Sequence, residues 1–202
     1  MRITERRLST KTLWIFCEGE KTEKNYFRKL KIDERVPGLI IKIISPKTCD
    51  PLEIIKYAYT YAKSKGFQKG DTLYCVFDRD DNSDQKLQQA EKFAKANNLN
   101  IIFSNPCFEY WILSHFEYYA NSCEYPELKS KIELYIKPYK KNDSEIYNKT
   151  KDKLPEAIRN SKKILKKHKE NGIPQISRNS NPSTKVFELI EKIREIKETK
   201  TK

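Results

Sequence analysis

Two groups of acidic residues, each directly after a short apolar run, are the residues of this chain best suited to chemistry. The first run ends at Cys17 and the second at Phe77, and six carboxylates follow them: Glu18, Glu20, Glu23, Asp78, Asp80 and Asp81. Because the carboxyl ends of parallel strands meet at one edge of an open α/β sheet, we expect these side chains to converge. Carboxylates on an otherwise basic chain indicate a divalent cation, Mg²⁺ or Mn²⁺ in its place, that works on a phosphate backbone.

Asp78 and Asp80 form the best-spaced pair, since residues two apart in a strand point to the same side. Beyond the end of the strand both carboxylates can reach one ion, and Mg²⁺ held by few carboxylates keeps positions for water and phosphate. The alternative is an acidic turn that leads into a helix beginning near Ser83. For this pair taken alone, both interpretations stay open.

Glu18 strengthens the case for a metal. It follows the first apolar run and precedes Gly19, which permits a tight turn from strand to helix. If the first and third strands are neighbours, Glu18 faces Asp78 and Asp80, and three carboxylates this close repel one another unless a cation neutralises them. Glu109 is a further candidate, either as a ligand or general base or as an acid that favours a helix N-terminus.

The apolar patterns predict the elements that must position these residues. Strands are expected at 11–17, 39–44, 71–77 and 99–103, and helices between them at 22–31, 51–66, 83–97 and 107–118. Such alternation predicts an α/β fold with a mostly parallel sheet flanked by helices. The later part is predicted to be helical at 126–136, at 155–168 and from Val186 onward, with loops at 137–153 and 173–180. Thr22, Asp50 and Ser83 are the predicted helix N-caps.

The charge is unevenly distributed along the 202 residues, whose formal net charge is +13. Residues 1–124 hold 20 Lys and Arg against 17 Asp and Glu, whereas residues 125–202 hold 21 against 11. We therefore predict a catalytic domain over 1–124 and a basic helical extension over 125–202 that attracts polyanions. Lys140, Lys141 and Lys185 are the candidate phosphate contacts, and Tyr135 and Tyr139 are candidates for stacking on unpaired bases. The alternative for each lysine is a solvated surface position.

The cysteines and histidines favour other roles. Five cysteines without a C-x-x-C pair, and two histidines far from any cysteine pair, give no zinc pattern and favour a reducing, cytoplasmic setting. His115 lies in an apolar run and is more consistent with packing than with catalysis. No apolar run approaches the ~20 residues of a membrane span, and the charged start at residues 1–7 leads into no signal segment.

At these positions the sequence resembles a known family. A strand followed by Glu18-Gly19, and a strand followed by Asp78-x-Asp80, resemble the Toprim domain of topoisomerases, bacterial primases and OLD-type nucleases. Longer sequence segments around these positions resemble those of the RloB-like proteins. Four such segments run in order along the chain: 17–27, 77–81, 104–111 and 181–186. The resemblance implies a Toprim-like sheet, Mg²⁺ at Glu18, Asp78 and Asp80, and a place in bacterial restriction-linked or phage-defence loci.

One spacing departs from the pattern. OLD-type nucleases have a second acid four residues after the Toprim Glu, whereas Glu23 follows Glu18 by five, so Glu23 is a candidate ligand outside that pattern. The main functional prediction is a Mg²⁺-dependent endonuclease acting on RNA or DNA in anti-phage defence. The alternative is a non-catalytic module that binds Mg²⁺ and nucleic acid beside an ATPase or a restriction-modification component, since the chain lacks a G-x-x-x-x-G-K-[ST] motif. Self-association into a homo-oligomer is left open.

Overall fold

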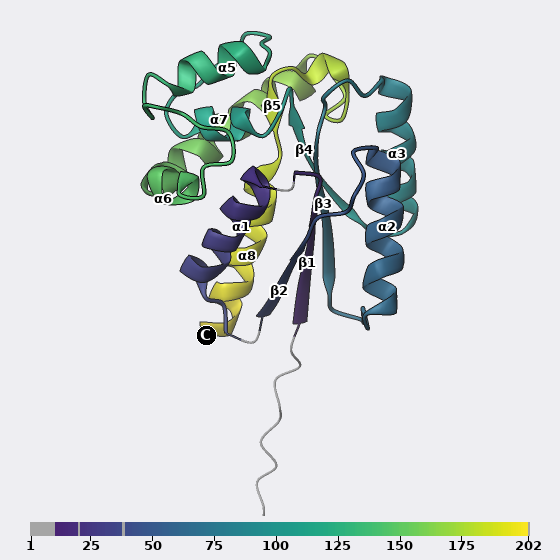
Figure 1. Ribbon diagram of the computed structural model, residues 1–202. Helices are drawn as coiled ribbons and strands as arrows, with labels where there is room; N and C mark the ends of the chain where they lie inside the picture. The colour runs from purple at the N-terminus through teal and green to yellow at the C-terminus, as the bar shows by residue number, and fades with distance from the viewer. Residues whose placement is uncertain (1–10, 20, 38, 202) are drawn as a thin grey trace, which may run out of the picture.

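A five-stranded sheet forms the centre of the molecule (Figure 1). The computed structural model describes residues 11–19, 21–37 and 39–201, so Glu20 and the charged start of the chain lie outside the described residues. The strands are β1 (Lys11–Cys17), β2 (Leu39–Ile44), β3 (Thr72–Asp78), β4 (Asn100–Asn105) and β5 (Ser183–Thr184), in the order β2-β1-β3-β4-β5. The first four are parallel and β5 is antiparallel to β4. The predicted α/β class with a mostly parallel sheet is confirmed.

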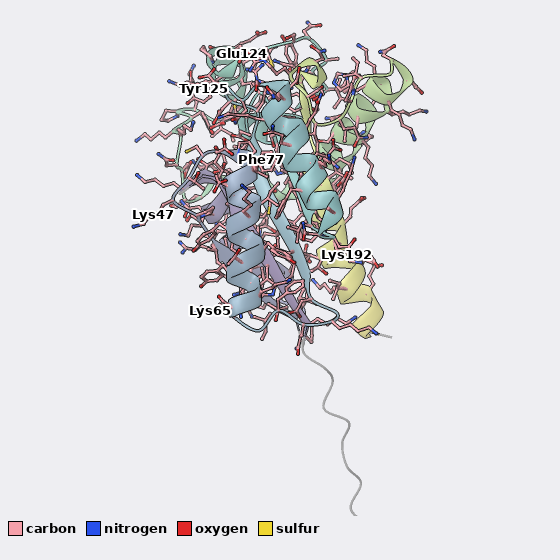
Figure 2. All side chains as sticks on the ribbon, turned by 90° about the vertical axis from the view of Figure 1, so that its right-hand side faces the viewer. Lys47, Lys65, Phe77, Glu124, Tyr125 and Lys192 are labelled. Carbon is pink, nitrogen blue, oxygen red and sulfur yellow. The ribbon has the colours of Figure 1, made fainter. Side chains whose placement is uncertain are left out.

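Helices cover both faces of the sheet because alternate residues of each strand point to opposite sides. Leu13 and Ile15 of β1 belong to one buried cluster, which also receives α1 (Thr22–Glu34) and α8 (Val186–Thr201). Trp14 and Phe16 belong to the other, beneath α2 (Pro51–Ser64) and α3 (Asp84–Ala96). Figure 2 shows α2 and α3 together in front of the sheet on that second face. This two-sided cover accounts for the nearly continuous apolar runs in the strands.

The second half of the chain is helical but differs in detail from the prediction. It contains α4 (Glu109–Ser114), α5 (Tyr125–Ile132), α6 (Ile146–Thr150) and α7 (Leu154–Glu170), with 3₁₀ turns η1 (Lys151–Lys153) and η2 (Arg178–Ser180). The apolar helix predicted at 107–118 is thus much shorter, and the loop predicted at 137–153 contains α6 and η1. Figure 1 shows α5, α6 and α7 grouped at the upper end of the molecule, toward which β1 and β3 run.

The chain then returns to the sheet through β5, an element missing from the sequence interpretation. Ser183 pairs with Asn105 and Thr184 with Ser104, and both β5 residues are buried. A two-residue strand is too short to produce the alternation by which strands are predicted. The division at 124/125 stays a prediction, although β5 and α8 of the later segment complete the sheet and its core.

Two of the three predicted helix caps are confirmed. The Asp50 carboxylate accepts the backbone N–H groups of Leu52 and Glu53, and the Ser83 hydroxyl accepts that of Lys86. The prediction for Thr22 is wrong, because α1 is preceded by Lys21 without a side-chain cap. The Thr22 hydroxyl instead accepts the backbone N–H of Asn142 at 3.2 Å. This bond ties the start of α1 to the basic loop that follows α5.

Two expectations about the remaining elements are met. The ring of His115 is buried and its Nδ1 lies 2.9 Å from the carbonyl oxygen of Trp111, as expected for a packed histidine. Within the described part of the chain, each helix is either too short or too polar to serve as a membrane span.

Candidate metal centre

The ends of β1 and β3 bring Glu18 and Asp78 together. The two strands are neighbours, as predicted, with Cys17 in register with Val76. The backbone N–H of Glu18 continues the ladder by donating to the Val76 carbonyl at 2.9 Å. The Glu18 carboxylate in turn accepts the backbone N–H of Asp78 at 3.0 Å. The sheet itself therefore fixes the distance between the two acidic residues.

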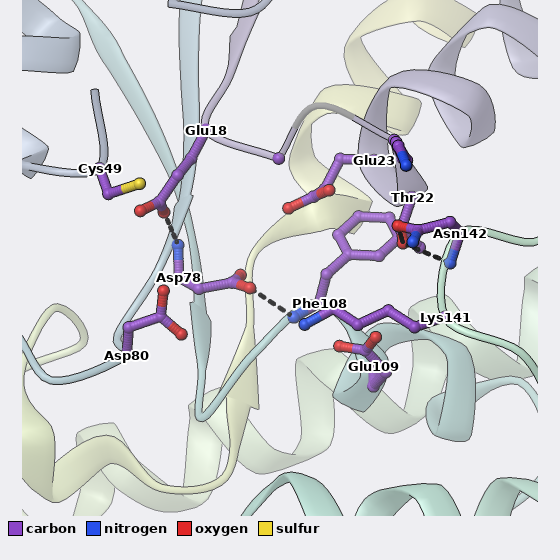
Figure 3. A pocket seen from close by; sticks show the side chains of 12 residues that line it. Glu18, Thr22, Glu23, Cys49, Asp78, Asp80, Phe108, Glu109, Lys141 and Asn142 are labelled. Atoms are coloured by element: carbon purple, nitrogen blue, oxygen red, sulfur yellow. Dashed lines mark hydrogen bonds between the residues drawn. The ribbon is translucent and has the colours of Figure 1, made fainter. Parts of the chain in front are cut away.

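A cavity of about 350 Å³ opens at this point, and its polar lining is mainly acidic (Figure 3). All five of the carboxylates predicted as catalytic or metal-binding line it: Glu18, Glu23, Asp78, Asp80 and Glu109. They come from the position directly after β1, the end of β3, the turn after β3, and the first turns of α1 and α4. Lys21 and Lys141 are the basic residues among the described ones in the lining. The structure thus gathers carboxylates that are up to 91 positions apart in the chain, from Glu18 to Glu109.

Asp78 lies at the centre of the group and is only partly satisfied. Its Oδ2 accepts the backbone N–H of Phe108 at 3.1 Å, which orients the carboxylate across the cavity (Figure 3). Its Oδ1 and the Oε1 of Glu18 are buried without a hydrogen-bond partner among the described residues. Burial, reinforced by the neighbouring acids, raises the pKa of Asp78 well above its ordinary range and that of Glu18 to about 8.

Asp80 shares the cavity wall but belongs to a turn. Its backbone is left-handed, with φ of 40°, a conformation that aspartate tolerates better than most residues. Figure 3 shows its carboxylate beside that of Asp78. Arg79, between them, turns away: its Nη2 donates to the Glu124 carboxylate at 2.6 Å and its Nε to the Asp80 carbonyl at 3.1 Å. The Arg79 guanidinium therefore stabilises the turn after β3 and does not neutralise the acidic residues of the cavity.

Glu23 reaches the cavity over Gly19. Its side chain is buried, and burial together with nearby Glu109 raises its pKa to about 7. A Cβ atom at position 19 would lie 1.7 Å from Oε2 of Glu23. The missing side chain at Gly19 therefore leaves the space that the Glu23 carboxylate occupies. This close approach, more than the freedom of the glycine backbone, explains the Glu18-Gly19 pair.

Gly19→Ala is accordingly expected to expel the Glu23 side chain and to weaken divalent-metal binding as much as Glu23→Ala does. The two changes act on the same atoms, so the double variant should bind the metal no more weakly than either single variant. Calorimetric titration of the three variants with Mn²⁺ measures this. Additive losses would mean that Gly19 acts through something other than the Glu23 carboxylate.

Glu109 closes the far side of the cavity. It is 1% exposed, and its Oε1 accepts the hydroxyl of Tyr139 at 3.1 Å. Lys141 extends into the cavity from the loop after α5 (Figure 3). Burial disfavours the charged amine, but Glu109 and the other groups around it outweigh this effect and raise the pKa of Lys141. The acidic cluster thus keeps a fixed cation at its edge.

The donor set fits a hard cation that keeps part of its hydration shell. The side-chain ligands offered are carboxylate oxygens. Two of these oxygens are buried and have no hydrogen-bond partner in the part of the chain that the structure describes, which is costly unless a cation binds them. Across residues 11–19, 21–37 and 39–201, no three His, Cys, Asp or Glu side chains already surround a common point as metal ligands would. Glu18, Asp78 and Asp80 are the residues that would hold such an ion together with water.

The predicted nucleic-acid contacts divide into two groups. Lys140 and Lys141 line a second cavity next to the acidic one. Lys185 lies elsewhere: it pairs with Glu188 at 3.3 Å and borders a separate cavity beside the end of α3. The stacking predicted for Tyr139 is wrong because its ring is buried against the site. Tyr135 is exposed, but one face of its ring already stacks on Phe116, with centroids 4.8 Å apart.

Several residues of the site had no signal in the sequence. The backbone N–H of Phe108 holds Asp78, and Asn142 and Cys49 line the cavity. A backbone donor cannot be recognised from residue type, and Cys49 lies in a loop far from both acidic groups in the chain. Residues 105–109, in contrast, belong to the segment 104–111 that resembles the RloB-like proteins. This resemblance favours a functional role for Glu109.

The fold and the site define a class of protein: an α/β domain with a carboxylate cluster at the carboxyl ends of two adjacent parallel strands. A family model described as RloB-like protein matches residues 13–193. The chain belongs to the RloB-like family. No significant match is found among curated proteins or among solved structures.

Proposed function

We propose that this protein is a Mg²⁺-dependent endonuclease that hydrolyses phosphodiester bonds of RNA or DNA in bacterial anti-phage defence, in the cytoplasm. One observation supports this most strongly: at two adjacent strand ends, two buried carboxylate oxygens have no hydrogen-bond partner among the described residues, in a cavity that adjoins a lysine-lined one. The Toprim-type character of the domain is part of the same proposal. Buried carboxylates close to one another favour a bound metal ion, and the lysines of the adjoining cavity favour a polyanionic substrate.

The side chains divide the work according to their position. Glu18, Asp78 and Asp80 would hold the ion, with Glu23 as a further ligand, and Mg²⁺ when bound supplies an activated water and stabilises charge on the scissile phosphate. Glu109, oriented by the Tyr139 hydroxyl, would accept a proton at its carboxylate as a general base. Lys141 would contact a phosphate oxygen at the cavity edge.

The second candidate function is the non-catalytic module, because carboxylates for an ion and lysines for a polyanion line adjoining cavities whether or not a reaction takes place there. In that case the carboxylates would bind Mg²⁺ for structure or sensing, and the basic segment would dock on nucleic acid or on an ATPase or restriction-modification partner. This alternative predicts binding without turnover.

Incubation with labelled RNA and DNA, in Mg²⁺ and in chelator, separates the two functions. The nuclease proposal expects cleavage only with Mg²⁺ or Mn²⁺, and at least a tenfold lower rate for Glu109→Gln, as for loss of a general base. Equal cleavage by wild-type protein and Glu109→Gln would remove Glu109 from the mechanism. Binding of either nucleic acid without any metal-dependent product would favour the non-catalytic module.

A further inference from the structure

A third cavity adjoins the acidic one. Its volume is about 440 Å³, and it shares Cys49 and Asp80 with the acidic cavity. The other wall residues include Pro106, Asn82 and Tyr125. Figure 2 shows Tyr125 beside Glu124 at the upper end of the molecule, the end to which β3 runs. The volume is ample for one nucleobase with its sugar.

The acidic cavity shares wall residues with both of its neighbours. The lysine-lined cavity of about 530 Å³ shares Lys141 and Asn142 with the acidic one. It is also lined by Lys137, Lys140 and Lys149. The lysine-lined cavity therefore offers positive charge for phosphates. The third cavity offers an aromatic ring and an amide group, and the two cations in its described lining, Arg79 and Lys86, are already paired with Glu124 and Asp50. An extended nucleic-acid strand has the matching sequence of groups.

The Tyr125 wall of the third cavity is held in place by the protein itself. Arg79, whose side chain is 10% exposed, joins Glu124 to the Asp80 turn and so fixes the residue before Tyr125. The ammonium group of Lys141 lies 4.9 Å from the centroid of the Tyr125 ring, which links this ring to the acidic cavity. The ring is partly exposed. Its position is thus defined without a ligand, and it retains accessible surface.

Asn82 provides a polar group on the same wall. Its backbone atoms are bonded, but its side-chain amide makes no hydrogen bond within the described part of the chain. An amide has both a donor and an acceptor, the groups needed to read the edge of a base. A stacking ring and a free amide on one wall suit an unpaired base better than a phosphate.

We propose that the cavity between Tyr125 and Asn82 is a nucleobase subsite, and that the substrate is single-stranded nucleic acid, with one base stacked on Tyr125 and its neighbouring phosphates directed toward Lys140. The inference rests on the proposed function for the position of the scissile phosphate. Bases within a duplex are stacked and paired, and cannot present a face to the ring. The subsite therefore selects against duplex substrates.

The test is an affinity measurement in chelator, so that it does not depend on cleavage. Fluorescence anisotropy at one salt concentration compares a labelled single-stranded oligonucleotide with a hairpin duplex of the same length, each as RNA and as DNA. Wild-type protein is expected to bind the single strand more tightly. Tyr125→Ala should weaken single-strand binding about tenfold, the loss of one stacked base, and leave duplex binding unchanged, while Tyr125→Phe retains the affinity.

Two further variants complete the design. Lys140→Ala should weaken single-strand and duplex binding alike, because a phosphate contact does not depend on base pairing. Tyr57→Ala, which removes an exposed tyrosine of α2, should change neither. Unchanged single-strand affinity in Tyr125→Ala, or an equal loss in Tyr125→Ala and Tyr125→Phe, would overturn the subsite. Base-dependent binding without cleavage would leave the subsite standing and overturn the nuclease proposal instead.

Discussion

Asp78→Asn is expected to make the metal-free protein more stable and at the same time to abolish metal-dependent cleavage. The carboxylate of Asp78 is buried among other acids, and its pKa is raised because burial and the neighbouring charges disfavour ionisation. Asparagine keeps an acceptor for the Phe108 N–H but removes the ionisable carboxyl group. Removing a buried carboxyl group whose Oδ1 has no partner among the described residues is worth about 1 kcal/mol or more, which corresponds to ~2–4 °C in melting temperature for a chain of this length.

The cleavage rate should fall by about 10²–10³-fold or more, as when a group that stabilises charge in the transition state is removed. Thermal unfolding in chelator and cleavage in Mg²⁺ measure the two effects. Asp152→Asn is the matched control, because it makes the same substitution at an exposed aspartate away from the site. A lower melting temperature for Asp78→Asn would show that interactions within the fold already stabilise the Asp78 carboxylate without a bound cation.

The second large effect concerns pH. The ordinary pKa of Glu18 is 4.5 and burial raises it to about 8 in the fold, so the folded protein holds a proton that the unfolded chain releases. This contribution to stability is fully present below pH 4.5 and is lost as the pH rises toward 8. The metal-free protein should therefore lose melting temperature across this interval, and saturating Mg²⁺ should offset the loss at the upper end.

Glu18→Gln is expected to flatten this dependence, because glutamine still accepts the Asp78 N–H but does not titrate. Glu198→Gln, a change at an exposed glutamate of α8, should leave the wild-type slope intact. Melting curves from pH 4.5 to 8, with chelator and with Mg²⁺, give the comparison. Identical slopes for wild-type protein and Glu18→Gln would assign the pH dependence to other groups.

Local sequence patterns were sufficient to predict the parallel part of the sheet. The runs at 11–17 and 39–44 are apolar on both sides of the strand, and both strands have the predicted bounds. Asp50 and Ser83 also act as predicted, because an N-cap depends only on neighbouring backbone atoms. These features arise within a few residues of the chain, where sequence reasoning is strongest.

Features that depend on distant contacts were not predicted. Thr22 has the right residue type for a cap, but the Asn142 backbone competes for its hydroxyl from 120 positions away. The residue type of Tyr139 favours an exposed ring that stacks on bases. In the structure the side chain is buried and its hydroxyl donates a hydrogen bond to Glu109. The apolar segment after Pro106 forms a short helix because tertiary packing, more than helical periodicity, accounts for its buried side chains.

The candidate site was predicted in its acidic residues but not in its surroundings. Strand order brings Glu18 next to Asp78, and motif similarity led to Glu109, so all five carboxylates of the cavity were named from the sequence. No local sequence pattern identifies the other wall residues. These include the backbone N–H of Phe108 and the side chain of Cys49 in the acidic cavity, and the ring of Tyr125 in the third cavity. Lys185 has the right charge but faces Glu188.

The central claim, that this carboxylate cavity binds a divalent cation, is tested most directly by calorimetric titration with Mg²⁺ and Mn²⁺. The titration is run near pH 7 in two buffers of different ionisation enthalpy. The account predicts saturable binding by wild-type protein with release of protons, because burial raises the pKa of Glu18 to about 8 and the ion displaces the proton that this carboxyl group then holds near pH 7. It predicts no saturable binding by Asp78→Asn. Absence of binding by the wild-type protein, or equal binding by the variant, would contradict it.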